Sequence, residues 1–305
     1  MRSKNSLFGG VRNLSRSRPS RPNRGGLGSV STMRVWINGR LLDRSDEPAV
    51  SVLDHGITVG DGVFETAQIV DGQAFALTRH LDRLTTSALG LGLAPPDTEA
   101  VRAGAKAVIE AQEIPYGALR ITVTAGIGPL GSARLDSEQT VIVAAQPIKR
   151  PGPTTAIVTV PWPRNERGVL AGLKTTSYAE NALLVSRARA EGATEAVMPN
   201  TVGELCEGTG SNVFYVLDGT LVTPTLASGC LAGITRALVT EWCDVVERDD
   251  TIDVLHTADE VFLTSSTRAV LPVHAVDHRS LDAPGPITRD VLETWERRVK
   301  DDVDP

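Results

Sequence analysis

The stretch AGLKTTSYAENALL, residues 171–184, places a lysine between a small apolar segment and a cluster of hydroxyl side chains that opens a helix. The chain has five lysines, and four of them lie in polar or charged surroundings, whereas Lys174 follows Ala171-Gly172-Leu173. Apolar surroundings lower the pKa of an ammonium group and make the neutral, nucleophilic amine accessible. Lys174 is therefore a candidate Schiff-base lysine, the alternative being a solvated lysine before a helix.

Two glycine-containing motifs downstream have groups suited to a ligand. In CEGTGSN, 206–212, Glu207 precedes small residues that let a ligand approach the backbone, although Glu207 alone is also compatible with a solvated loop acid. In LAGITR, 231–236, a glycine precedes a helix start, whose free N–H groups and positive dipole end suit a phosphate. Most glycine-led helix starts bind nothing, so this motif needs support from other residues.

Two arginines and a hydroxyl loop extend the candidate site. Arg83 lies on a helix expected to be capped by Thr78, where it either binds phosphate in a bidentate manner or forms an ion pair with Asp82 or another acid. Arg120 lies in the alternating strand LRITVTA and is a candidate contact for a substrate carboxylate, the alternative being an ion pair at the domain surface. The loop TSSTR, 264–268, adds Thr267 as a hydroxyl donor.

Composition and charge restrict the class of protein. The 305 residues have ordinary apolar and charged fractions, which indicates a globular chain of about two domains. Residues 1–32 hold seven positive charges and no acid, and we expect a disordered extension or a start at Met33. Without these residues the net charge falls from −6 to about −13, which argues against a nucleic-acid partner.

Targeting and metal-binding signals are weak. The sequence has no uninterrupted apolar stretch of membrane-spanning length and no secretory h-region, so we expect no membrane association and a cytoplasmic location. Cys206, Cys230 and Cys243 lack metal-site spacing and the histidines are scattered, so buried free thiols are expected and no metal site is predicted.

Helical and strand patterns are mixed without strict βαβ alternation, which predicts an α+β fold with largely antiparallel or mixed sheets. Asn38-Gly39, Asp71-Gly72 and Asp218-Gly219 predict hairpin turns. Helices are expected from 78, from 97 to 112, from 177 to 191 and from 233 to about 247, and buried or alternating strands at 119–125, 140–146, 155–160, 195–198 and 261–264. The predicted divisions are an N-terminal small domain at 33–146, a proline-rich linker at 147–154 and a C-terminal cofactor-binding domain at 155–305.

A Schiff-base lysine, an acid for a pyridine nitrogen, and a phosphate cup of arginine and helix N-terminus are together the requirements of pyridoxal 5′-phosphate (PLP). Residues 33 to about 280 resemble the class IV, fold-type IV PLP enzymes, which include branched-chain aminotransferases, D-amino-acid aminotransferases and aminodeoxychorismate lyases. The resemblance rests on five motifs in the family's order: GDGVFET (60–66), HLDRL (80–84), LKTTSYAEN (173–181), EGTGSN (207–212) and LAGITR (231–236).

The resemblance implies a small N-terminal α/β domain, a larger C-terminal domain with a barrel-like mixed sheet, and a homodimer with PLP between the domains. It implies that Lys174 holds PLP covalently and that Glu207 pairs with the pyridinium nitrogen. The remaining expected cofactor contacts are Arg83, Ser211, Asn212, Ile234, Thr235 and Thr267.

The reaction is harder to predict than the cofactor. D-amino-acid aminotransferases resemble one another in an Arg-x-His carboxylate trap, where this chain has GPLGSARL, and the overall motif pattern most resembles aminodeoxychorismate lyases. We therefore expect conversion of 4-amino-4-deoxychorismate to 4-aminobenzoate and pyruvate in folate synthesis, with Lys174 as base and Thr66 or Thr176 as candidate proton donors. The alternatives are a branched-chain or related aminotransferase and a non-catalytic phosphate-ligand or nucleic-acid module.

Overall fold

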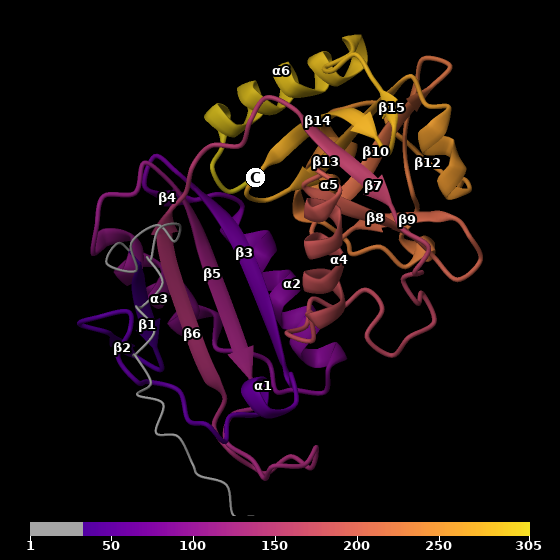
Figure 1. Cartoon of the computed structure of the whole chain (residues 1–305). Coiled ribbons are helices and arrows are strands. Elements are labelled where there is room, and N and C mark those ends of the chain that lie inside the picture. The colour runs from indigo at the N-terminus through magenta and orange to yellow at the C-terminus, as the bar shows by residue number, and fades with distance from the viewer. Residues whose placement is uncertain (1–32) are drawn as a thin grey trace, which may run out of the picture.

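The computed structural model describes residues 33–305, and the predicted basic extension at 1–32 lies outside the described residues. The strands of the described chain form two sheets, one from the first half of the chain and one from the second (Figure 1). The first sheet is antiparallel, in the order β2-β1-β6-β5-β3-β4. Its strands are β1 (Arg34–Ile37), β2 (Arg40–Leu41), β3 (Gly62–Val70), β4 (Gln73–Ala74), β5 (Tyr116–Thr124) and β6 (Thr140–Pro147).

The predicted hairpin turns are confirmed. Asn38 and Gly39 have φ values of 43° and 90° and connect β1 to β2, and the two other Asp-Gly turns also have positive φ at both residues. Positive φ at both central positions is what a two-residue type I′ turn requires. Strand β5 also alternates as expected, because Leu119, Ile121 and Val123 are completely buried.

The first half has three helices, α1 (His55–Thr58), α2 (Leu77–Gly90) and α3 (Thr98–Glu110). Helices α2 and α3 pack against this sheet. The apolar stripe of α2, including Leu81, Leu84 and Ala88, packs with β3 and β5 into a continuous buried core. The predicted cap at Thr78 is wrong: the N-cap is Ala76, in a left-handed conformation with no side-chain cap bond. The hydroxyl of Thr78 instead donates to Asp304 near the C-terminus, at 2.5 Å.

The second sheet is mixed, in the order β12-β11-β10-β13-β14-β7-β8-β9, with β15 pairing β14. Its strands are β7 (Thr155–Thr159), β8 (Glu195–Pro199), β9 (Leu205–Gly208), β10 (Asn212–Leu217), β11 (Thr220–Thr223), β12 (Val246–Glu247), β13 (Glu260–Ser265), β14 (Ala269–Val276) and β15 (Arg279–Ser280). Parallel pairs join β7 to both β8 and β14, and the other long pairs are antiparallel. The α+β class with antiparallel and mixed sheets is therefore confirmed.

Helices of the second half are α4 (Ala179–Ala190), α5 (Ile234–Trp242) and α6 (Pro286–Asp301), with short 3-10 turns η2 (Leu226–Ser228) and η3 (Ile252–His256). Helix α5 ends at Trp242, five residues before the predicted end, because the chain leaves the helix and β12 pairs with β11. Helix α6 was not predicted. It packs through Val291 and Trp295 into a core with β10 and β13, and lies at the top of Figure 1.

The two halves are joined by backbone pairing around the candidate lysine. The amide of Phe64 in β3 donates to the carbonyl of Lys174 at 2.9 Å, and Thr175 forms a bridge with Val63. The C-terminal end also returns to the first half, where the amide of Ala76 donates to Val303 at 2.7 Å. That the halves are separate domains with a linker at 147–154 stays a prediction.

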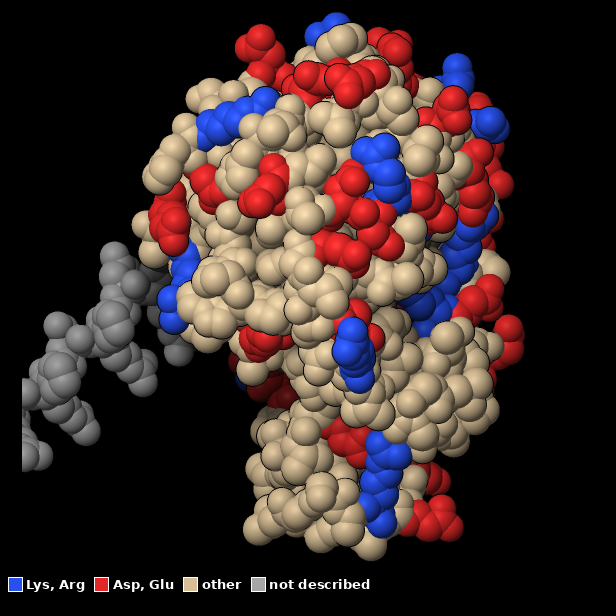
Figure 2. Space-filling model, turned by 90° about the vertical axis from the view of Figure 1, so that its right-hand side faces the viewer, with Lys and Arg blue, Asp and Glu red and all other residues tan. Residues whose placement is uncertain are grey.

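The surface shown in Figure 2 carries acidic and basic side chains interspersed, rather than one broad basic area. In the described part of the chain, no helix has the length and apolar content needed to cross a membrane.

Candidate active site

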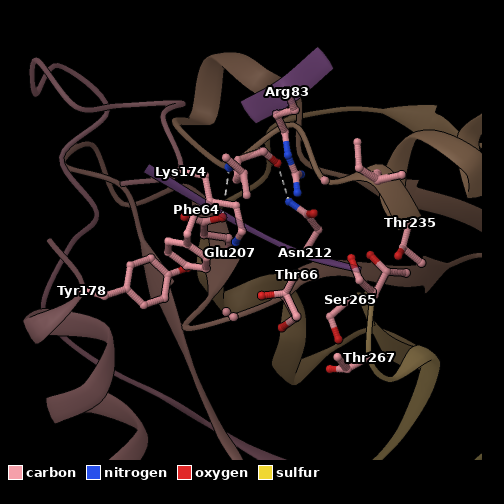
Figure 3. Close-up of a pocket in the computed structure, with 18 of the residues that line it drawn as sticks. Phe64, Thr66, Arg83, Lys174, Tyr178, Glu207, Asn212, Thr235, Ser265 and Thr267 are labelled. Carbon is pink, nitrogen blue, oxygen red and sulfur yellow. Dashed lines mark hydrogen bonds between the residues drawn. The ribbon is translucent and has the colours of Figure 1, made fainter. Parts of the chain in front are cut away.

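A cavity of about 210 Å³ lies where strand β3, helix α2 and the segment after Leu173 meet the start of α5 and the end of β13. It is lined by nearly all of the residues that were predicted from the sequence to form the site. These are Thr66, Arg83, Arg120, Lys174, Glu207, Ser211, Asn212, Ile234, Thr235 and Thr267. Figure 3 shows the aromatic side chains of Phe64 and Tyr178 at one side of the cavity and the hydroxyls of Thr235, Ser265 and Thr267 at the other.

Lys174 is held by backbone contacts to both β3 and α2. Its carbonyl accepts from Phe64, and its amide donates to the hydroxyl of Ser87 at 3.2 Å. The Nζ atom lies 4.4 Å from the centre of the Phe64 ring and 5.7 Å from that of Tyr178. Burial lowers the pKa of Lys174 to about 8, although Glu65 and Glu207 oppose the shift. A fraction on the order of one tenth of the amine is therefore neutral at pH 7, far more than for an ordinary lysine, and the neutral amine is the form that a nucleophile or base requires.

Thr176 is the predicted site residue that does not line this cavity. Its hydroxyl donates to the carbonyls of Gly60 and Gly62, at 2.9 and 3.2 Å. The side chain therefore fixes the segment after Lys174 against the start of β3, and Thr66 is the remaining candidate proton donor of the two.

Glu207 approaches the cavity from β9. Its carboxylate accepts from Arg164 Nε at 3.2 Å and from the Leu231 amide at 2.9 Å. Burial raises the pKa of Glu207, and the cation of Arg164 only partly opposes this rise. Two single hydrogen bonds leave acceptor capacity on the carboxylate, which can take about four. Glu207 is also close enough to Lys174 to influence its pKa.

Arg83 is paired with an acid that the sequence analysis overlooked. Glu65 in β3 is completely buried and accepts two hydrogen bonds from Arg83, both at 2.7 Å, and one from His80 at 2.6 Å. Burial alone would raise the pKa of Glu65, but Arg83 and His80 lower it to about 2. Arg83 Nη1 also donates to the carbonyl of Ala232 at 2.8 Å, which joins α2 to the loop before α5.

The start of α5 provides groups that can bind a phosphate. Its N-cap is Gly233, which has no side chain to accept from the first N–H groups of the helix, and a Cβ there would collide with Asn212 Oδ1. Such N–H groups have no intrahelical partner. Thr264 also lines this cavity. The free N–H groups of the helix start, together with Thr235 and Thr267 on the cavity wall, can serve an oxyanion.

Arg120 and Thr66 lie on neighbouring strands at the same register position. Arg120 Nη1 donates to the Thr66 hydroxyl at 3.5 Å, and its guanidinium carbon lies 3.4 Å from the centre of the Phe64 ring. Although Arg120 is accessible from the cavity, partial burial lowers its pKa to about 10, so it stays cationic at neutral pH. The structure thus places the guanidinium of Arg120 and the amine of Lys174 against the same aromatic ring, with the Thr66 hydroxyl next to the guanidinium.

The sequence analysis missed Tyr178, Glu65 and Arg164. Burial raises the pKa of Tyr178 to about 12, so its hydroxyl remains a hydrogen-bond donor throughout the neutral range. The signal for Glu65 was its place in a largely apolar strand. It lies on the same strand face as the buried Val63 and Ala67, because residues two apart point the same way. Arg164 gave no local signal, because it reaches Glu207 across 43 residues of sequence.

These residues fit PLP. The donors at Arg83, Thr235, Thr267 and the α5 N-terminus suit its phosphate, and the carboxylate of Glu207 suits its ring nitrogen. The amine of Lys174, with its lowered pKa, suits covalent attachment to its aldehyde. The helix start at Gly233 has no capping side chain, and a Cβ there would collide with Asn212, so the first N–H groups of α5 stay open to an oxygen-rich group.

Known proteins resemble the chain in sequence along most of its length. A provisionally named branched-chain-amino-acid aminotransferase of Methanocaldococcus jannaschii is 33% identical over 288 residues, which cover 86% of this chain and 95% of the relative. A D-alanine aminotransferase of Bacillus licheniformis is 32% identical over 279 residues, which cover 88% and 97%.

A solved structure resembles the chain in fold. A provisionally identified 4-amino-4-deoxychorismate lyase of Legionella pneumophila superposes with a TM-score of 0.78 at 25% identity, covering 83% of this chain and 96% of that one. Likeness of this extent confirms the predicted fold-type IV architecture of two curled, half-barrel sheets.

The family model for class IV aminotransferases matches residues 62–276, a range that includes the lysine, both glutamates and the phosphate-suited loops. Enzymes of this family act on small molecules and use PLP. The chain therefore belongs to the class IV aminotransferase family of PLP-dependent enzymes.

Proposed function

We propose that the chain is an aminodeoxychorismate lyase, which converts 4-amino-4-deoxychorismate to 4-aminobenzoate and pyruvate. The observation that carries the proposal is the position of Arg120. No ion pair joins Arg120 to a carboxylate in residues 33–305; its side-chain hydrogen bonds go to the hydroxyls of Thr66 and Thr122. A cation held near Lys174 without an anionic partner favours a substrate that carries a carboxylate.

The loop after β5 supports a substrate other than a D-amino acid. Its basic residue, Arg134, forms a bidentate ion pair with Asp61, at 2.6 and 2.7 Å. Its remaining donors contact the carbonyls of Leu91 and Gly92, both at 2.9 Å. Four of the five N–H donors of Arg134 are thus already engaged, and the loop of this chain contains no histidine. A second cation for a carboxylate on the reacting carbon is therefore missing from this loop.

The residues of the chain have separate roles in the proposed reaction. Lys174 removes the proton from the amine-bearing carbon, because it is the buried amine with the lowered pKa. Arg120 binds the carboxylate of the enolpyruvyl group, and the neighbouring Thr66 hydroxyl is positioned to protonate the departing oxygen. Enolpyruvate leaves as the ring becomes aromatic. The released enolpyruvate then tautomerises to pyruvate, so no water or oxidant is consumed.

When bound, PLP supplies an electron-withdrawing ring that stabilises negative charge at the amine-bearing carbon. Glu207 would keep the proton on the ring nitrogen, since a carboxylate beside that nitrogen favours its charged form. Arg83, Thr235 and Thr267 would hold the phosphate. Tyr178 presents a protonated hydroxyl on the opposite side of the cavity.

The proposal is tested with purified, PLP-loaded protein and 4-amino-4-deoxychorismate. We expect 4-aminobenzoate, followed by its fluorescence, and an equal amount of pyruvate, followed by coupling to lactate dehydrogenase. Arg120→Gln should raise KM more than it lowers kcat, because it removes a substrate contact. The proposal is wrong if no aminobenzoate forms while an amino acid and 2-oxoglutarate are turned over.

Amino transfer is the second candidate, and the sequence relatives favour it. Both relatives described above are named as aminotransferases, one for branched-chain amino acids and one for D-alanine. This candidate predicts that leucine or D-alanine donates its amino group to the enzyme and that 2-oxoglutarate regenerates the starting form. Incubation with each amino acid alone, followed by absorption spectroscopy, distinguishes it from the lyase.

We further infer a cytoplasmic homodimer from the family resemblance. Exposed apolar side chains at Val52, Ile57 and Leu130 are compatible with a covered surface at the end of the first sheet. Light scattering coupled to gel filtration measures the mass of the particle and tests this inference.

A further inference from the structure

An ion pair with a buried carboxylate lies behind the hydroxyl-rich end of the cavity. Glu195, at the start of β8, is 2% exposed, and its carboxylate accepts from the Gly210 amide at 2.5 Å and from the Ser211 hydroxyl at 2.9 Å. It also accepts from the Thr209 hydroxyl at 3.3 Å. One buried carboxylate therefore fixes the loop between β9 and β10, two residues of which, Gly210 and Ser211, line the cavity.

Arg268 completes this arrangement from the second loop of the cavity. Its guanidinium forms an ion pair with Glu195, and it donates to the Ser265 hydroxyl at 3.0 Å and to the Gly210 carbonyl at 3.4 Å. The Glu195–Arg268 pair thus ties the loop at 208–212 to the loop at 264–268, which carries Ser265 and Thr267 on the cavity wall.

The pair itself does not line the cavity. The Glu195 side chain is buried, whereas that of Arg268 is 24% exposed. A buried carboxylate is costly unless it is paired and hydrogen-bonded, and here Arg268 and the residues at 209–211 satisfy it. Removing Arg268 would leave the carboxylate buried without its cation, and removing Glu195 would take away the acceptor that anchors both loops. The pair is electrically neutral, so attraction of an anion is left to Arg83 and to the N-terminus of α5.

We propose that Glu195 and Arg268 are positioning residues, which set the spacing of the two hydroxyl-bearing loops so that they fit the phosphate of PLP. The inference rests on the cofactor orientation described above, with its phosphate at the α5 end, and does not depend on whether the reaction is a lyase or a transferase reaction. It predicts a selective effect: the pair matters for the phosphate and not for the ring or the aldehyde.

The test compares two ligands on the apoenzyme. Glu195→Gln and Arg268→Gln are each titrated with PLP and with pyridoxal, which lacks the phosphate, and binding is followed by equilibrium dialysis. We expect each variant to bind PLP about tenfold more weakly or worse, and to bind pyridoxal within about twofold of the wild type. Equal weakening for both ligands, or no weakening of PLP binding, would overturn the proposal.

Two controls keep the result interpretable. Arg83→Gln removes a direct phosphate contact and should show the same selectivity, whereas Glu207→Gln, at the ring nitrogen, should weaken both ligands similarly. If either glutamine variant fails to fold by circular dichroism, Arg268→Lys replaces it, because lysine keeps the charge and loses the two-loop geometry. Selectivity in Arg268→Lys supports the proposal and its absence contradicts it. Since binding is measured without substrate, a failed lyase assay leaves this result unaffected.

Discussion

Glu65 and Glu207 come one from each sheet and both influence the pKa of Lys174, and their own pKa values move in opposite directions. The pKa of Glu65 is lowered to about 2, and that of Glu207 is raised. Burial acts in the same direction on both, so it does not explain the difference. Glu65 accepts three hydrogen bonds of 2.7 Å or less from Arg83 and His80, whereas Glu207 accepts one from Arg164 at 3.2 Å and one from a backbone amide.

The comparison shows that hydrogen-bond donors, rather than depth, assign the two roles. The lone pairs of Glu65 are taken up by hydrogen-bond donors that belong to the protein, so this carboxylate anchors Arg83 and has little left for a ligand. Glu207 accepts fewer hydrogen bonds than Glu65, and a cationic ring nitrogen would supply a further donor. The first sheet therefore provides a fixed framework, and the second provides the reactive contact.

Lys174→Ala, the largest expected effect, removes the group that both glutamates influence. We expect catalytic activity to fall by about 10³-fold or more, because nucleophile and base are lost together. The variant should also lose the covalent cofactor adduct that borohydride traps in the wild type, as measured by intact-protein mass spectrometry. An adduct of unchanged yield in Lys174→Ala would place the attachment elsewhere.

Glu65→Ala tests the framework side of the comparison. Leaving Arg83 and His80 buried without their shared acceptor should lower the free energy of unfolding by about 3–5 kcal/mol. Urea denaturation of the apoenzyme measures this. The matched control is Glu47→Gln, whose partner Arg40 is exposed and whose loss should cost about 1 kcal/mol or less. Similar losses in the two variants would contradict the assigned difference.

The pH dependence of stability tests the same carboxylate without a mutation. Because the folded-state pKa of Glu65 lies below its ordinary value of 4.5, the unfolded chain binds the proton more readily. The stabilisation is complete above about pH 4.5 and is lost as the pH falls toward 2, by about 3 kcal/mol. Comparison of wild type and Glu65→Gln by denaturant unfolding between pH 2 and 6 isolates this contribution. Parallel stability curves would show that Glu65 titrates normally.

Glu207→Gln tests the reactive side. We expect kcat to fall by about 10²-fold, since a neutral amide cannot hold a proton on the ring nitrogen, while stability changes by only about 1 kcal/mol. The measurements are steady-state kinetics and urea denaturation on the same preparation. A loss of stability as large as that of Glu65→Ala would remove the distinction between the two carboxylates.

Arg164→Gln is expected to have the smallest effect of these variants, and it tests how the cation beside Glu207 affects the pKa of that carboxylate. Without this cation, burial raises the pKa of Glu207 further, so the activity should fall about tenfold at neutral pH and recover partly as the pH rises. A pH profile of kcat measures this. Glu180→Gln is the matched control, because it removes the other, exposed partner of Arg164 and should leave the profile near that of the wild type.

Much of the framework was predictable because its causes are local. The Asn38-Gly39 turn needs positive φ at two adjacent residues, and the burial of Leu119, Ile121 and Val123 follows from strand alternation. The role of Thr78 and the end of α5 were predicted incorrectly because contacts with distant parts of the chain decide them. Thr78 bonds Asp304, 226 residues away, and residues after Trp242 leave the helix to pair with β11.

The sequence by itself determined which chemical groups were available: a lysine in apolar surroundings at 174, a glutamate before small residues at 207, and a glycine-led helix start at 233. Only the tertiary structure decided how they are used. In the folded chain Arg83 forms an ion pair with Glu65, the Thr176 hydroxyl bonds a backbone carbonyl outside the cavity, and Glu195 forms an ion pair with Arg268. The physical reason is that protonation and hydrogen bonding depend on distances of a few ångströms between groups that are far apart in the chain, such as the Arg83 guanidinium and the Ala232 carbonyl, which are 149 residues apart.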